Sequence, residues 1–147
     1  MAETLTTTIT ESVTLQGAAR GNTITETYSI DNVFERVVTI GTDQITLYST
    51  HASLPEGNVF DDDLVKYARI TNLHSSQTVT IEITNDQGDE ALFKIKAGES
   101  FILNGHDDMC SFKEGAAVDA GLHAITIVKA TASGAATPVE VFVASSN

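Results

Sequence analysis

The feature that most constrains the fold is a two-residue alternation of apolar and polar side chains that recurs along the chain. Its clearest instance lies at residues 78–84, where Val79, Ile81 and Ile83 alternate with threonine and glutamate. Because successive side chains of a β-strand point to opposite faces of a sheet, this alternation predicts a strand with one buried face. No ten-residue segment has the periodicity of an amphipathic helix, so parallel strands joined by helices are not expected.

Turn signals rich in Gly, Asn, Asp and Ser separate the alternating segments at intervals of about 8–12 residues, which is typical of sandwiches. The spacing predicts an all-β fold, a β-sandwich or jelly roll of about nine to ten short antiparallel strands. Asp31-Asn32 and residues 96–99 favour tight hairpin turns. Residues 51–63 and 104–121 interrupt the pattern. We expect the chain to change sheets at the first interruption and to form one helical turn near residues 116–119 of the second.

The size of the chain fits one domain. At 147 residues, a globule hides roughly 70% of the surface of its unfolded chain and needs no disulfide or metal to fold. Hydrophobic residues make up 41% of the chain and aromatic residues only 6%, without Trp. We therefore expect a single β-sandwich domain over residues 1–147, with an aliphatic core.

The first fifteen residues are almost wholly threonine and aliphatic side chains. Leu5, Ile9, Val13 and Leu15 share one parity and so one face of an extended strand. Two interpretations stay open. Residues 1–15 are either an ordinary first strand, or an N-terminal arm or edge strand that pairs with a neighbouring subunit.

Charge limits the partners. Twenty acidic residues against eight basic ones give a formal net charge of −12. Such a surface repels phosphate backbones and anionic membranes, so neither nucleic acid nor membrane is expected as a partner. The simplest interpretation of the acidity is solubility, and the alternative is attraction to a basic partner or to cations.

Export signals and disulfides are not expected. The opening residues do not combine a basic region with an apolar stretch, as a signal peptide would. No apolar run reaches the 18 residues or so that a transmembrane helix needs. The single cysteine, Cys110, has no partner for an internal disulfide. We expect a protein made in a cytoplasm.

Catalytic motifs are not found. The chain has no Gly-x-Ser-x-Gly elbow, no phosphate-binding glycine loop and no zinc-ligand spacing. The one nucleophile with a nearby base is Cys110, four residues after His106, and sequence proximity in a loop does not ensure a hydrogen bond between them. We therefore expect no enzyme activity, no catalytic residues and no cofactor.

Acidic loops supply the only metal candidates. Asp61, Asp62 and Asp63 place three carboxylates together, and weaker groups follow at residues 85–90 and 107–108. Calcium prefers six to eight oxygen ligands, and none of these runs has EF-hand spacing. Solvated loops that discourage edge pairing are the simpler interpretation.

Two segments carry a resemblance to a known group of proteins. Residues 67–103 read YARITNLHSSQTVTIEITNDQGDEALFKIKAGESFIL, and residues 5–30 read LTTTITESVTLQGAARGNTITETYSI. Together they resemble small β-sandwich virion proteins of tailed bacteriophages, especially phages of marine bacteria. The resemblance implies a non-enzymatic structural protein of the virion. Decoration or cement proteins of this kind bind the major capsid protein or another virion protein, often as homo-trimers, and other members of the style belong to tails and fibres.

Three hypotheses follow. The leading one is a capsid decoration protein that binds the capsid shell and its own copies, assembled in the host cytoplasm and located in the virion. The alternative is a tail or fibre module that binds a host-surface glycan through the two irregular stretches. The third is a small hydrolase or lyase that uses the neighbourhood of His106 and Cys110.

Overall fold

The computed structural model describes residues 3–50, 60–61, 64–106 and 122–146. In this part of the chain there are twelve strands and no α-helix. Two four-stranded antiparallel sheets pack together, which confirms the expected all-β sandwich. The strands are β1 (Glu3–Thr10), β2 (Val13–Leu15), β3 (Ala18–Arg20), β4 (Thr23–Ile30), β5 (Asn32–Ile40), β6 (Ile45–Ser49), β7 (Val65–Asn72), β8 (Val79–Asn85), β9 (Glu90–Ile95), β10 (Ser100–Leu103), β11 (Ile125–Ala132) and β12 (Thr137–Ser145).

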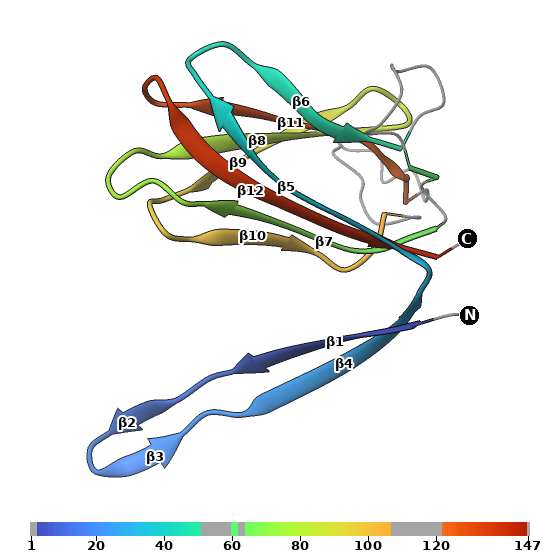
Figure 1. The fold of residues 1–147 in the computed structure, drawn as a ribbon. Coiled ribbons are helices and arrows are strands. Elements are labelled where there is room, and N and C mark those ends of the chain that lie inside the picture. Colours follow the sequence, from blue (N-terminus) through green and yellow to red (C-terminus); the bar gives the residue numbers. More distant parts are fainter. Residues whose placement is uncertain (1–2, 51–59, 62–63, 107–121, 147) are drawn as a thin grey trace, which may run out of the picture.

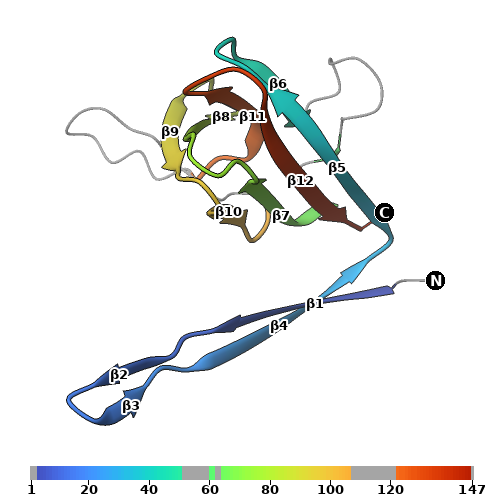
Figure 2. The same cartoon turned by 60° about the vertical axis from the view of Figure 1, so that its left-hand side comes forward.

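The sandwich has the strand order of a jelly roll. One sheet has the order β10-β7-β12-β5, and the other has the order β6-β11-β8-β9. Four of the pairs are nested in sequence, namely β5 with β12, β6 with β11, β7 with β10 and β8 with β9. A long antiparallel hairpin with these nested pairs, rolled up into two facing sheets, is a jelly roll (Figures 1 and 2).

The core lies between the two sheets, where the sequence alternation places it. Val79 and Ile81 of β8 and Val139 and Val141 of β12 are fully buried, while the residues between them are partly exposed. Burial of one such side chain contributes about 1.5–3 kcal/mol to folding. The period-two pattern therefore predicts the buried face of these strands correctly.

Two expected hairpins are wrong. Strand β4 does not turn back onto β5 at Asp31, because β4 pairs with β1 and β5 pairs with β12. The Asp31 amide instead donates to the Ser145 carbonyl at 2.9 Å. Residues 96–99 do form a turn, but it leads from β9 in one sheet to β10 in the other. In a jelly roll most consecutive strands lie in opposite sheets, so a turn signal marks a crossing as readily as a hairpin.

The connection over residues 51–63 does change sheets, as expected, because β6 and β7 belong to different sheets. Residues 51–59 and 62–63 lie outside the described residues, and so does the helical turn expected at 116–119. Within the described ranges, no helix has the length and apolarity needed to cross a membrane.

The first four strands form one long hairpin that projects from the sandwich (Figures 1 and 2). The pairing runs from Glu3 opposite Ile30 to Leu15 opposite Ala18 without a change of register. Gln16 and Gly17 close it with φ values of 51° and 80°. Positive φ at both central residues is the signature of a type I′ turn, whose twist matches that of the strands. We call residues 3–30 the arm.

Candidate interaction surface

The arm has two chemically different faces. Its first face, called here the apolar face, carries most of the aliphatic side chains, namely Leu5, Ile9, Val13, Leu15, Ile24 and Ile30, together with Tyr28. Its second face, called the hydroxyl face, carries only threonine and serine along β1 and β4: Thr4, Thr6, Thr8, Thr10, Thr23, Thr25, Thr27 and Ser29. Paired residues of an antiparallel ribbon point to the same side, so each face is continuous across both strands.

The base of the apolar face is fixed to the sandwich. Ile30 packs with Tyr67 of β7 and Ala144 of β12, and Leu5, Tyr28 and Phe142 surround this cluster. The ring centroids of Tyr28 and Tyr67 are 6.1 Å apart. Burial, together with a hydrogen bond to the Glu26 carboxylate, raises the pKa of Tyr28 to about 12. These contacts set the orientation of the base of the arm relative to the sandwich.

Farther along, the same face is uncovered. The exposed fractions of Ile9, Ile24, Val13 and Leu15 are 51, 52, 54 and 57%. Glu11 and Asn22 lie between Ile9–Ile24 and Val13 on this face and interrupt the row. Exposed aliphatic side chains that gather on one face still mark an interaction site more often than an ordinary surface does. An isolated two-stranded ribbon is also only marginally stable in water. The part of the arm beyond Leu5 and Tyr28 therefore has the properties of a surface that binds a partner.

The sequence predicted three of the four residues of this row. Leu5, Ile9, Val13 and Leu15 do share a face of the arm. The contribution of Ile24, which lies directly opposite Ile9, was not foreseen. The turn at residues 16–17 could have predicted the position of Ile24. A two-residue turn sets which residue of the second strand lies opposite each residue of the first strand.

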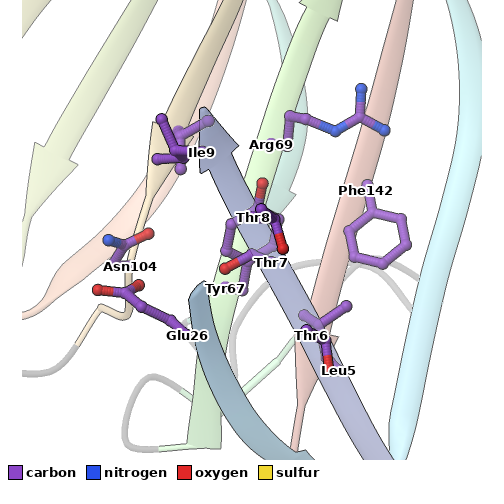
Figure 3. Close-up of a pocket in the computed structure, with 11 residues that line it drawn as sticks. Leu5, Thr6, Thr7, Thr8, Ile9, Glu26, Tyr67, Arg69, Asn104 and Phe142 are labelled. Atoms are coloured by element: carbon purple, nitrogen blue, oxygen red, sulfur yellow. The ribbon is translucent and has the colours of Figure 1, made fainter. Parts of the chain in front are cut away.

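A wedge-shaped cavity of about 410 Å³ separates the arm from the outer face of the sandwich (Figure 3). Consecutive residues of β1, from Leu5 to Ile9, form one wall of the cavity. Side chains of β7, β10 and β12 contribute to the other wall. They include Tyr67, Arg69, Ile102 and Phe142.

The wedge offers apolar contacts more than charge. Ile102 is 41% exposed at its rim. The Arg69 guanidinium binds the Glu140 carboxylate at 2.7 Å and lies 5.9 Å from the centre of the Phe142 ring. The Glu26 carboxylate also lines the wedge and accepts a hydrogen bond from Tyr28 Oη. Because both charged groups already have a partner, the wedge is suited to an apolar or neutral chain segment.

The histidines do not form a catalytic group in the described residues. His106 is fully buried, and its Nε2 lies 2.8 Å from Tyr48 Oη. Desolvation lowers the pKa of His106 to about 4. His74 Nδ1 accepts backbone amides of its own turn, and His123 Nδ1 lies 3.0 Å from Asp86 Oδ1. Cys110, the proposed nucleophile, lies outside the described residues.

The calcium candidates are only partly described. The Asp61 carbonyl accepts hydrogen bonds from the amides of Leu64 and Val65 at 3.1 and 3.2 Å, while Asp62 and Asp63 lie outside the described residues. Over the ranges that the structure describes, no three His, Cys, Asp or Glu side chains come together as a metal site would require. Calcium binding at residues 61–63 stays a prediction.

The two long connections start from the same end of the sandwich. The Thr50 amide donates to the Thr126 carbonyl at 2.7 Å, and the Ile125 amide donates to the His106 carbonyl at 2.9 Å. Most of the residues that a glycan-binding module would use, 51–59 and 107–121, lie outside the described part of the chain. That alternative also stays a prediction.

Comparisons of the chain with protein-family models, with curated proteins and with solved structures find no match.

Proposed function

We propose that the chain is a non-enzymatic structural protein of a bacteriophage virion, a capsid decoration protein that binds the major capsid shell and its own copies through the arm. The observation that carries the proposal is the uncovered row of Ile9, Val13, Leu15 and Ile24 on a ribbon that extends away from the sandwich. The resemblance of residues 5–30 and 67–103 to virion proteins supports it.

Burial of the exposed aliphatic side chains favours binding of the arm to a partner. Covering a half-exposed aliphatic side chain contributes roughly 1 kcal/mol, since complete burial is worth about 1.5–3 kcal/mol. Several such residues on one face also supply the packing that a two-stranded ribbon lacks on its own. Binding would therefore stabilise the arm and bury its apolar face in one step.

The two faces of the arm also set its orientation on a partner. The hydroxyl face of β1 and β4 is compatible with water along its length, since its side chains are threonine and serine. The apolar face is the one that gains by contact. A net charge of −12 keeps the remaining surface soluble and disfavours the packaged nucleic acid as the partner.

The experiment is a binding assay with capsids that have been stripped of this protein. Replacing Ile9 and Ile24 together by threonine keeps β-branched residues in both strands while it removes apolar surface. We expect the double variant to bind capsids at least tenfold more weakly than the wild type. The matched control is Leu92→Thr, on β9 of the sandwich, where the leucine is 66% exposed.

Two outcomes would reject the proposal. One is wild-type affinity in the Ile9→Thr, Ile24→Thr variant, which would remove the arm from the interface. The other is the absence of the protein from purified particles by mass spectrometry. Deleting residues 1–15 is a less clean test in this fold, because it would leave β4 without its partner strand.

A further inference from the structure

The arm has two free backbone edges. Among the described residues, β1 and β4 pair only with each other. The Glu11 amide donates to the carbonyl of Asn22, its direct partner, at 2.8 Å. In an antiparallel ladder the paired groups alternate. The amides and carbonyls of Thr6 and Thr8 on β1, and of Thr25 and Thr27 on β4, therefore point away from the hairpin.

Two of the usual protections against pairing are missing from both edges, and the third is present only as Glu3 and Glu26 on the apolar face. Natural edge strands are blocked by lysine, proline or an inward-pointing charge. Residues 3–30 contain no lysine and no proline. The residues whose backbone groups point outward along β1 and β4 are all threonine or serine, which are favourable in cross-strand pairs. These edges are open to a further strand.

We propose that the arms of different copies join head to tail, with the free edge of β1 in one copy pairing with the free edge of β4 in the next. The inference rests on the proposed function, and it specifies how copies of the protein bind one another. The same register that joins β1 to β4 within a copy serves between copies. It places Ile9 opposite Ile24 and Leu5 opposite Tyr28 of the second copy.

Charge disfavours a symmetric pairing that places Leu5 opposite Ile9 or Ile24 opposite Tyr28. If β1 paired with β1 so that Leu5 faced Ile9 of the second copy, Glu3 would face Glu11. If β4 paired with β4 so that Ile24 faced Tyr28, Glu26 would face Glu26 of the second copy. Like charges directly opposite each other destabilise a sheet. In the head-to-tail register Glu26 faces Thr7 and Glu3 faces Ile30, so no carboxylates meet.

The wedge adjoins the part of β1 where the incoming strand would pair. Its arm-side wall is the run of consecutive β1 residues from Leu5 to Ile9, so the cavity borders the β1 backbone itself and not only one face of it. A strand added there would contact the rings of Tyr67 and Phe142 on the sandwich side. Three or more strands with an apolar face are the minimum for an independently stable sheet, and head-to-tail pairing provides them.

Head-to-tail contacts close into a ring when the rotation between copies allows it. A trimer would be one such ring, whereas the β1–β1 and β4–β4 alternatives give dimers. The three arrangements therefore predict different behaviour for variants with a single blocked edge.

The test uses proline at positions whose amides point outward. Thr8→Pro removes a donor from the free edge of β1, and Thr25→Pro removes one from the free edge of β4, while both leave the bonds within the hairpin intact. We expect wild-type protein to be an oligomer in solution and each variant alone to be a monomer. An equimolar mixture should form a one-to-one heterodimer, because each variant keeps the edge that the other has lost.

The readout is the mass in solution by light scattering, at one protein concentration. Heterodimer formation also shows that both proline variants keep a folded arm. If Thr25→Pro alone dimerises, the pairing is β1 with β1; if Thr8→Pro alone dimerises, it is β4 with β4. Either result overturns the inference, as does a mixture that stays monomeric. A monomeric wild type that still binds capsids rejects the inference alone, and an oligomer that is absent from particles rejects the proposed function alone.

Discussion

Tyr48 Oη and His106 Nε2 lie 2.8 Å apart in the sandwich, with both side chains fully buried. Tyr48 belongs to β6, shortly before the connection over residues 51–63, and His106 stands shortly after β10, at the start of the second irregular stretch. One hydrogen bond thus links the starts of the two longest connections in the chain. Its burial makes it sensitive to pH.

Acid is expected to weaken the fold through His106. Burial lowers the pKa of this imidazole to about 4 from its ordinary value of 6.5, so the folded protein holds it neutral where the unfolded chain takes up a proton. Above pH 6.5 both states are neutral, and the contribution is complete. As the pH falls from 6.5 to 4, about 3 kcal/mol of stability is lost. The measurement is urea unfolding across this range.

A double variant isolates the histidine from the many carboxylates that titrate in the same range. Replacing Tyr48 and His106 together by phenylalanine removes both polar groups and keeps two aromatic rings in the core. We expect its stability to depend less on pH between 6.5 and 4 than that of the wild type. Identical pH profiles for the two proteins would contradict the assignment to His106.

Tyr48→Phe alone is expected to lower the free energy of unfolding by more than the loss of a typical hydrogen bond would. The phenol oxygen is removed, and the buried Nε2 of His106 loses its partner. An unsatisfied buried polar atom costs about 1–3 kcal/mol. The double variant with His106→Phe should recover part of that loss, because no orphaned polar group remains. If the single variant were as stable as the wild type, the hydrogen bond would contribute nothing to the fold.

Gly21 is expected to resist substitution within the arm. Its φ is +131°, and an added Cβ would lie 2.0 Å from the Glu11 carbonyl oxygen. Backbone atoms cannot move aside as a side chain can, so Gly21→Ala should distort the pairing of the two strands here. Hydrogen exchange at the arm amides is the measurement, and faster exchange than in the wild type is the expected result.

Gly17 provides the matched control for that substitution. Its φ of +80° also lies in the left-handed region, but a Cβ there meets no atom within 4 Å. Asn tolerates such a conformation in a type I′ turn. Gly17→Asn should therefore leave the exchange rates of the arm close to wild type. Equal effects of the two substitutions would show that the close approach at Gly21 is unimportant.

The alternation of apolar and polar residues was enough to predict the sandwich and much of its core. Val79, Ile81, Val139 and Val141 are buried because a strand has two faces and only one of them meets the other sheet. Local patterns of this kind do not encode which strands become neighbours. The jelly-roll order depends on contacts between distant segments, such as β5 with β12.

For the candidate surface, too, the local pattern could be predicted from the sequence and the long-range contacts could not. Leu5, Ile9, Val13 and Leu15 could be placed on one face from their parity alone. The residue at which the arm ends could not be predicted. Asp31-Asn32 is typical of a hairpin turn, and yet Asp31 lies between two strands of different sheets. Only the packing of Ile30 against Tyr67 and Ala144 shows where the arm joins the sandwich.

Under the proposed function, the arm attaches this protein to a virion. The measurement is an electron cryo-microscopy reconstruction of purified phage particles that, under the proposed function, contain this protein. We expect density for the sandwich on the capsid surface, with Ile9 and Ile24 covered by the shell or by another copy. Particles without this density, or an arm that stands free in solvent on the assembled capsid, would contradict it.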